Sequence, residues 1–432
     1  MRYSRHAVRG WRWQNEGKGD KAMKFKLTSL EKKWVLYDVG NSAFTMMVST
    51  IFPIYFNYLA GNAGISDVDY LAYWGYATSV CTLLVAVLGP TLGAIADTKN
   101  FKKTVFFVAM GVGVFGCILL GFLSSWIWFL GIFVLAKTGY SASLIFYDAM
   151  LTDVTDPERM DAVSSHGYAW GYIGSCIPFV ACLGVVLGAK PLGIGMQTAM
   201  IIAFIITALW WLLSSVPLLR SYRQKYFAEV NGHVVKDSFK RLGKTFAELV
   251  KEKHIFVFLL AFFFYIDGVY TIIDMATAYG SALGLSSTGL LLALLLTQIV
   301  AFPFAIIFGR LAQKYSAEKL ITVCIVAYLG VAIFAIFLHY QWQFWVLAVW
   351  VGMFQGGVQA LSRSYFTKII PANQSGEFFG LMDICGKGAS FMGTTIVSLI
   401  SQLTGNINIG VGMIAVLFVI GIILFRRAAA LE

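Results

Sequence analysis

Two related stretches decide the fold. GAIADTKNFKK, residues Gly93–Lys103, closes one apolar run, and GRLAQKYSAEK, residues Gly309–Lys319, closes another 216 residues later. A glycine, an alanine and a lysine occupy the same positions in both copies. Each copy ends the second apolar run of its half of the chain. The repeat therefore indicates two halves built on one plan, as in membrane proteins made of paired helical bundles.

The composition places both halves in a membrane. Of 432 residues, 58% are hydrophobic and 13% are charged, and the mean hydropathy is +0.74; soluble domains carry about 25% charged residues. One span needs about 20 apolar residues. The sequence predicts an all-α membrane protein with twelve transmembrane helices in two pseudo-symmetric six-helix bundles. The predicted spans are 34–60, 70–96, 104–124, 126–150, 163–188, 196–219, 255–281, 288–309, 319–338, 342–362, 377–402 and 407–425.

Basic residues set the orientation. Of the 33 lysines and arginines, 30 fall on one side if both termini are cytoplasmic, and only Lys190 falls in an outer loop. Positive residues stay on the cytoplasmic side of membrane proteins, so we expect both termini inside. Much of the net charge of +11 thereby falls in cytoplasmic loops between spans that lie in the lipid bilayer, and it does not indicate a nucleic-acid partner.

The long loop divides the chain. We expect a cytoplasmic segment over 1–33, a bundle over 34–219, a linker over 220–254 and a bundle over 255–427. The linker carries apolar residues at helical spacing opposite lysines, which predicts an amphipathic helix on the inner leaflet; a calmodulin-like partner is the alternative. Residues 428–432 resemble a cloning remnant, and Met23 could be the natural start, which leaves 1–22 outside the fold.

The repeated loop resembles a family signature. Gly93, Asp97, Lys102 and Lys103 resemble the loop between the second and third spans of the major facilitator superfamily. In that position the aspartate pairs with a helix end or a cation when the cytoplasmic side is closed. The second copy keeps the glycine as Gly309, has Arg310 where the first copy has Ala94, and has Gln313 in place of the aspartate. We expect that half of the gate to be weaker.

Four other stretches are more specific. WVLYDVGNSAF (Trp34–Phe44), IFPIYF (Ile51–Phe56), GVQALSRSYF (Gly357–Phe366) and GEFFGLMDICGKGASFMG (Gly376–Gly393) resemble the branch that contains the autophagy-related vacuolar amino-acid effluxers and their bacterial relatives. The resemblance implies solute transport, in a bacterial inner (plasma) membrane. Val39 and Lys137 depart from the pattern of that branch, which leaves the solute open.

Six charged residues of the predicted spans are candidates for positions deep in the bilayer. A charge at the centre of a bilayer costs about 2.5–3.5 kcal/mol on insertion scales, so we expect these side chains to face the interior. They are Asp38, Lys137, Asp267, Asp274, Asp383 and Lys387. The last two are four residues apart, which suits either a structural ion pair within one helix or a role in coupling.

Polar stripes nominate a solute path. Helical spacing places Asp38, Asn41 and Thr45 on one face, and Asp267, Thr271 and Asp274 on another. The resemblance to the superfamily implies that spans 1, 4, 7 and 10 line the cavity. The candidate solute-binding residues are Asp38, Asn41, Thr45, Lys137, Tyr140, Tyr265, Asp267, Tyr270, Thr271, Asp274, Gln355 and Gln359.

Several of these residues have a second interpretation. Asp38 lies five residues after Lys33, so it could instead belong to the cytoplasmic gate. Asp148 and Arg363, at the inner ends of their spans, are expected in gate networks. Lys137 suits a solute anion or an ion pair between helices, and snorkelling is the alternative. The acidic residues from Asp153 to Asp161 are expected to form a solvated loop rather than a metal site.

The leading hypothesis is a secondary active transporter. It would move a small polar or zwitterionic organic solute by alternating access, with interior aspartates exchanging protons if transport is coupled. The alternative is a uniporter or an exporter of an anionic metabolite. A membrane-embedded enzyme and a channel are more distant, since no hydrolase, metalloprotease or nucleotide-binding motif occurs. We expect no cofactor, no metal and a monomer; the GxxxG pairs at Gly89 and Gly352 do not identify a dimer interface.

Overall fold

The computed structural model describes residues 25–229, 245, 249 and 251–431. The first group of helices comprises α1 (Ser29–Ser49), α2 (Ile51–Asn62), α3 (Asp67–Ala96), α4 (Phe101–Phe122), α5 (Trp126–Ala149), α6 (Leu151–Val154), α7 (Met160–Leu187) and α8 (Met196–Ser221). The second comprises α10 (Lys253–Ala282), α11 (Ser287–Leu311), α12 (Ala317–Ala335), α13 (Gln341–Ile369), the 3-10 turn η1 (Ala372–Gln374), α14 (Ser375–Thr404), α15 (Ile407–Gly412) and α16 (Ile414–Leu431).

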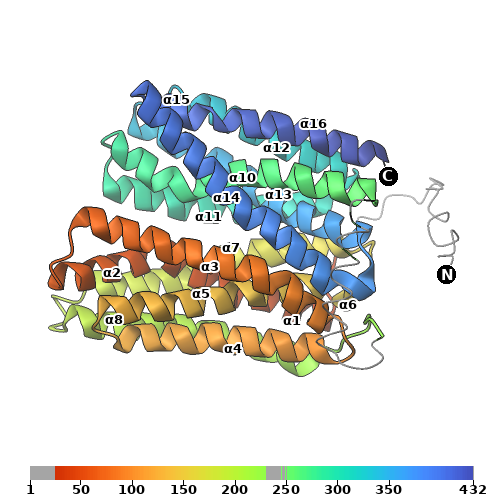
Figure 1. The fold of residues 1–432 in the computed structure, drawn as a ribbon, viewed down its shortest axis with the longest axis horizontal. Helices are drawn as coiled ribbons and strands as arrows, with labels where there is room; N and C mark the ends of the chain where they lie inside the picture. Colours follow the sequence, from red (N-terminus) through yellow and green to blue (C-terminus); the bar gives the residue numbers. More distant parts are fainter. Residues whose placement is uncertain (1–24, 230–244, 246–248, 250, 432) are drawn as a thin grey trace, which may run out of the picture.

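Among the described residues, eleven helices are long and apolar enough to cross a membrane. The 30-residue α14 also runs along the bundle beside them, and together they account for the twelve predicted spans. The helices α1 to α8 lie on one side of the molecule and α10 to α16 on the other (Figure 1). The prediction of an all-helical integral membrane fold is confirmed.

The first span differs from the prediction in its continuity. It is two helices, α1 and α2, separated at Thr50. Pro53 follows in the first turn of α2, where the residue lacks an N–H that could extend the preceding helix. At the other end of α1, Thr28 and Glu31 form a capping box, with each side chain accepting from the other's backbone N–H. The cap fixes where the span begins.

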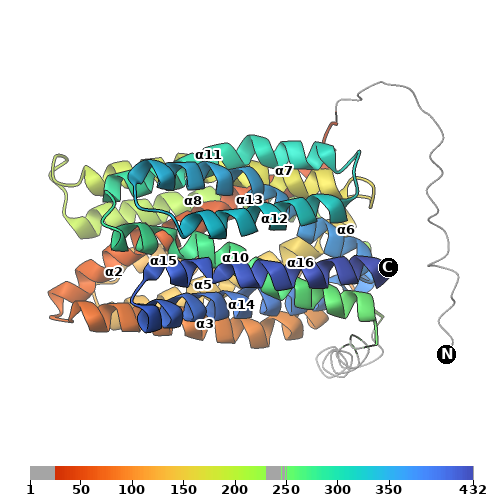
Figure 2. The same ribbon diagram turned by 90° about the horizontal axis from the view of Figure 1, so that it is seen from above.

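Glycines allow the two groups of helices to meet. The helix α3 packs against α14, and α7 packs against α11 and α13 (Figures 1 and 2). A Cβ on Gly93 would lie 2.2 Å from the carbonyl oxygen of Gly376, and one on Gly309 would lie 2.7 Å from the Cβ of Ser165. The two copies of the sequence repeat therefore hold equivalent helix crossings. Gly89 and Gly93 form a crossing within this chain.

Candidate functional site

A single arginine joins the two groups of helices. Arg363, near the end of α13, donates from Nη1 to Asp148 Oδ1 at 2.9 Å and lies 3.5 Å from Asp38 Oδ2 through Nη2. Its Nε donates to Ser164 Oγ at 2.9 Å, and its Nη2 donates to the Ser164 carbonyl at 3.0 Å. The side chain is only 4% exposed. A guanidinium can bind in several directions at once, and here its partners come from α1, α5 and α7.

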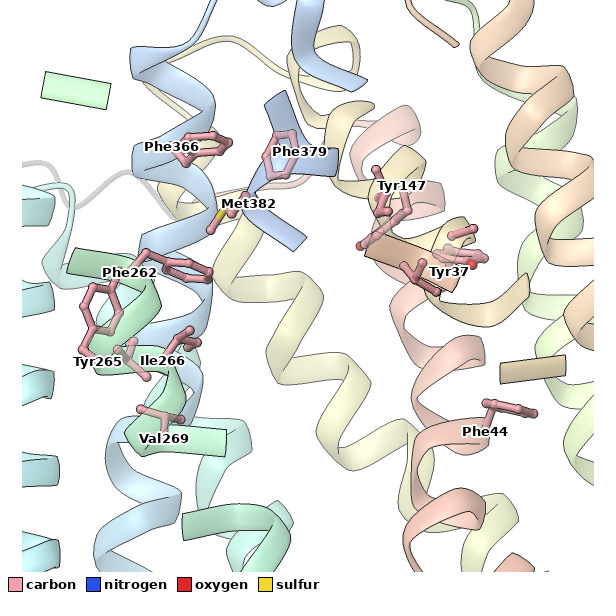
Figure 3. Packing of buried hydrophobic residues seen from close by; sticks show 14 of the residues in the cluster. Tyr37, Phe44, Tyr147, Phe262, Tyr265, Ile266, Val269, Phe366, Phe379 and Met382 are labelled. Carbon is pink, nitrogen blue, oxygen red and sulfur yellow. The ribbon is translucent and has the colours of Figure 1, made fainter. Parts of the chain in front are cut away.

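Aromatic rings enclose this arginine. Its Cζ lies 4.3 Å from the ring centre of Tyr168, 4.7 Å from that of Trp34 and 5.5 Å from that of Tyr147. Tyr147 also donates to Asp38 Oδ2 at 2.8 Å and packs against Tyr37, with ring centres 4.7 Å apart (Figure 3). The rings exclude water and attract the cation through their faces. Arg363 is therefore held in place by both charge and packing.

Residues that the sequence placed in gate networks or assigned two interpretations lie in this cluster. Asp148 and Arg363, expected in gate networks, contact each other directly. Of the two interpretations of Asp38, the structure places the side chain in this network, where it also accepts from Asn41 Nδ2 at 3.2 Å. Asn41 donates in addition to the Tyr37 carbonyl. In this state the polar side chains of Asp38 and Asn41 are thus bonded to other groups of the protein.

The signature aspartate caps a helix of the opposite group. Asp97, at the end of α3, accepts from the backbone N–H of Gly376 at 2.8 Å and of Glu377 at 2.9 Å. These N–H groups belong to the first turn of α14, where a carboxylate stabilises the positive end of the helix dipole. The close approach of Gly93 to Gly376 permits the contact. Asp97 is the residue through which α3 holds α14.

A buried lysine supports the cap. Lys102 Nζ lies 3.7 Å from Asp97 Oδ1 and 3.3 Å from Asp153 Oδ2, and it donates to Ser375 Oγ at 2.8 Å. None of the three charged side chains is exposed. Lys103, by contrast, is exposed. The two signature lysines therefore differ: one belongs to the network and the other faces outward.

Two acidic residues correct the prediction of a solvated loop. Asp153 is fully buried, and besides Lys102 it accepts from the backbone N–H groups of Lys225 and Tyr226, both at 2.9 Å. Asp161 accepts from Ser364 Oγ at 2.7 Å and from Lys368 Nζ at 2.6 Å, both on α13. The loop was predicted to be solvated because sequence does not show that α13 and the linker cover it. Asp156 and Glu158 are exposed, as predicted.

The start of the linker is extended rather than helical. Ala228 donates to the Asp97 carbonyl at 2.7 Å, and the Tyr222 hydroxyl donates to Asp153 Oδ2 at 2.5 Å. Burial and the neighbouring Asp153 raise the pKa of Tyr222 well above its usual value, so this hydroxyl remains a donor. The predicted amphipathic helix falls mostly on residues outside the described part of the chain.

The ion pairs and hydrogen bonds described above form three clusters, and all three lie at one end of the molecule. This is the end at which α5 and α13 finish and α14 begins, and we call it the gate end. The clusters centre on Arg363, on Asp97 with Lys102, and on Asp161. In each one, residues of the first group of helices bind residues of the second. The gate end is therefore closed in this structure.

Further along the helices, polar side chains of both groups approach one another. Thr45 Oγ1 and the Tyr140 hydroxyl form a hydrogen bond of 2.5 Å. Tyr270 of α10 interacts electrostatically with Tyr140, Asp148, Asp274 and Asp383. Lys137 is half-buried, with Nζ 5.6 Å from the ring centre of Phe133. The structure thus brings predicted residues of spans 1, 4, 7 and 11 to one region. The side chain of Lys387 lies outside the described residues.

The remaining predicted residues belong to helices of the second group. Tyr265 shares a hydrogen bond with Ser362 of α13 at 2.7 Å, which indicates packing between helices. Gln359 accepts from the Tyr172 hydroxyl at 3.4 Å. Thr271 and Gln355 line a mainly apolar cavity of about 90 Å³ between α10, α11, α12 and α13. Arg310 is exposed at the gate end.

Asp267 has an unusual environment. Its side chain is fully buried, and Oδ1 accepts from the Gly393 N–H at 2.9 Å and from Thr271 Oγ1 at 3.2 Å. Oδ2 has no hydrogen-bond partner among the described residues. The predicted stripe of Asp267, Thr271 and Asp274 therefore divides: Asp267 faces α14, whereas Asp274 is exposed.

Eleven helices able to cross a membrane among the described residues, α14 beside them, a repeated loop and polar clusters that join two helical groups are features of a transporter of the major facilitator superfamily. Residues 29–430 match the family described as "Vacuole effluxer Atg22 like", and the chain belongs to that family. The described homologues are transporters and not enzymes.

Relatives are similar in sequence, and solved structures share the fold. An uncharacterized MFS-type transporter, YxiO of Bacillus subtilis, is 42% identical over 404 residues, covering 92% of this chain and 94% of its own length. Autophagy-related protein 22 of Saccharomyces cerevisiae (strain YJM789) is 25% identical over 293 residues, which is 59% of this chain and 55% of that protein. The human organic anion transporter MFSD10 shares the fold with a TM-score of 0.70 at 13% identity, covering 92% of this chain and 99% of that one. FucP in its outward conformation also has a TM-score of 0.70 at 13% identity, covering 93% and 97%.

Proposed function

We propose that the protein carries a small polar or zwitterionic organic solute, of the amino-acid class, across a bacterial inner membrane by alternating access. The observation that carries the proposal is the set of clusters at the gate end, because residues 38, 97, 148 and 161 bind the second group of helices through contacts that a rocking motion would break and remake. Clusters of this kind stabilise one of two states.

We assign the gate end to the cytoplasm. Of the 33 basic residues, 30 lie on this side of the predicted topology, and cytoplasmic loops are rich in such residues. Both termini would then be cytoplasmic, and the closed gate would correspond to an outward-facing state. The two bundles, 34–219 and 255–427, would be the rigid units of the motion, and the carrier would act as a monomer.

The solute class is inferred from the charges along the path. Tyr270 lies within electrostatic reach of Asp274 and Asp383, and Lys137 is half-buried in the opposite group. Acids and a base on opposite sides suit a solute that carries both an ammonium and a carboxylate. Effluxers are named in the family description, which favours export. An anionic metabolite remains the alternative solute because of Lys137.

The test is a binding and transport experiment on the full chain. The purified protein is screened by thermal shift against amino acids, short peptides, nucleosides, sugars and phosphate esters, because a ligand of the native state raises its apparent stability. A compound that binds is then measured in proteoliposomes. Saturable counterflow of an amino acid, lost in Lys137→Ala, is expected. Binding confined to phosphate esters or other anions would overturn the zwitterion assignment, and flux that never saturates would indicate a channel.

A further inference from the structure

Asp267 is buried without the partners that a charged carboxylate needs. It lies on α10 with no exposed surface, and its Oδ2 has no hydrogen-bond partner among the described residues. An ionised carboxylate has room for about four donors, whereas this one receives two, both on Oδ1. Leaving a buried charge unpaired costs several kcal/mol, while a neutral carboxylic acid avoids that cost.

The position of the carboxyl is fixed by the helix that it faces. A Cβ on Gly393 would lie 2.4 Å from Asp267 Oδ1 and 2.1 Å from Thr271 Oγ1. Only a glycine therefore allows α14 to come this close and present its N–H. Because the Gly393 N–H and the Thr271 hydroxyl both orient Oδ1, the free Oδ2 is held in a defined place.

Within the described part of the chain, no ion pair involves the carboxyl of Asp267. The two hydrogen bonds to Asp267 among the described residues come from the Gly393 N–H and the Thr271 hydroxyl. Titratable and charged groups do occur on α10 itself and on the helices packed against it, and the side chain of Lys387 lies outside the described part. These groups are Lys253, His254, Tyr265, Tyr270, Asp274 and Tyr279 on α10, Arg310 on α11, Glu318, Lys319, Cys324 and Tyr328 on α12, Arg363, Tyr365 and Lys368 on α13, Glu377, Asp383 and Cys385 on α14, and Arg426 and Arg427 on α16.

We propose that Asp267 is the proton-binding site of the carrier, protonated on Oδ2 while the gate is closed and releasing that proton when α14 moves. This inference deepens the proposed function and rests on it for the link to solute movement. A proton fits better than a metal cation, since a cation needs several oxygen ligands and both partners of Oδ1 are donors. The proton passes between Oδ2 and water, and no other bond changes.

The fold provides a route for the proton and a link to the gate. Thr271 donates to Asp267 and also lines the cavity of about 90 Å³, whose mainly apolar wall includes the polar residues Thr297 and Gln355. A water bound to these polar groups would stand one hydroxyl away from the carboxyl. The link is α14: its first turn is held by Asp97 across the gate, and its Gly393 holds Asp267. Opening the gate would move α14 and loosen the Gly393 contact.

Infrared difference spectroscopy tests the site directly. The carbonyl stretch of a protonated carboxyl group is separate from the carboxylate bands, so wild type at neutral pH should show one such band that Asp267→Asn lacks. An asparagine at position 267 keeps the acceptor Oδ1 and mimics the neutral acid. Asp156→Asn, at an exposed loop position, is the matched control and should keep the band. A band that persists unchanged in Asp267→Asn would overturn the proposal.

Two further measurements separate this inference from the proposed function. Gly93→Ala weakens the gate at a distance, and the band should diminish in it; an undiminished band would refute the link through α14. In proteoliposomes, Asp267→Asn should keep solute counterflow and lose accumulation driven by a proton gradient. Gradient-driven accumulation equal to wild type in Asp267→Asn would refute coupling while leaving transport intact. Absence of counterflow in wild type would refute the proposed function and leave the spectroscopic result standing.

Discussion

At the scale of single residues, Arg363 shows how one side chain can hold two halves of a molecule together. Its five N–H donors are arranged in a rigid fork, and in this structure they reach Asp38, Asp148 and both oxygens of Ser164. A lysine in its place would carry the same charge on a single flexible ammonium. Charge alone therefore does not replace the arginine.

We expect Arg363→Lys to open the gate. The loss of two or more charge-assisted hydrogen bonds amounts to about 1.5–3 kcal/mol for each, and every 1.4 kcal/mol is about a tenfold change in an equilibrium. The measurement is maleimide labelling of Ala360→Cys, a buried position of α13, in a background without the six native cysteines. Labelling should rise at least about tenfold. Arg426→Lys, an exposed position, is the control, and equal labelling of both variants would contradict the role of Arg363.

At the scale of helices, the crossing of α3 and α14 depends on glycine. Gly93 approaches the Gly376 carbonyl so closely that a methyl group would have to lie 2.2 Å from it. Gly93→Ala should force the helices apart and remove the Asp97 cap from α14. Spin labels on Lys99 and Asn373, both exposed at the gate end of opposite groups, should report a longer distance in this variant. Gly111→Ala on α4, where no atom lies within 4 Å, should leave the distance unchanged and would raise helix stability by up to about 1 kcal/mol.

Helix-scale features were predictable from sequence to different degrees. Hydropathy predicts the spans because each must cross about 30 Å of hydrocarbon. The positions of Asp148 and Arg363 at the inner ends of their spans led to the hypothesis that both belong to gate networks. Residue spacing predicts how far along its helix Asp38 lies, but it does not identify Arg363 and Tyr147 as the residues that bind it. Asp153 and Asp161 were predicted to be solvated because contacts with the linker and with α13 leave no periodic signal in the sequence. The pairing of Asp267 with the backbone of α14 likewise required coordinates.

At the scale of the whole molecule, the clusters at the gate end should act as a lock that must open in every transport cycle. The hydroxyl oxygens of Thr152 and Ser375 lie 3.5 Å apart on opposite groups, within reach of a pair of cysteines that form a bond of about 2.05 Å after a small adjustment. Alternating access requires this contact to break, whereas a channel-like path through a fixed structure would not.

Thr152→Cys combined with Ser375→Cys should therefore arrest counterflow when oxidised and restore it when reduced. Binding of the solute from the outer side, measured by thermal shift on the oxidised protein, should persist, because only the gate end is fixed. The single variants, treated with the same oxidant, distinguish the cross-link from damage to the Lys102 and Ser375 contact. Counterflow that continues in a fully cross-linked sample would mean that the two groups need not separate at this end, and the rocking mechanism would have to be abandoned.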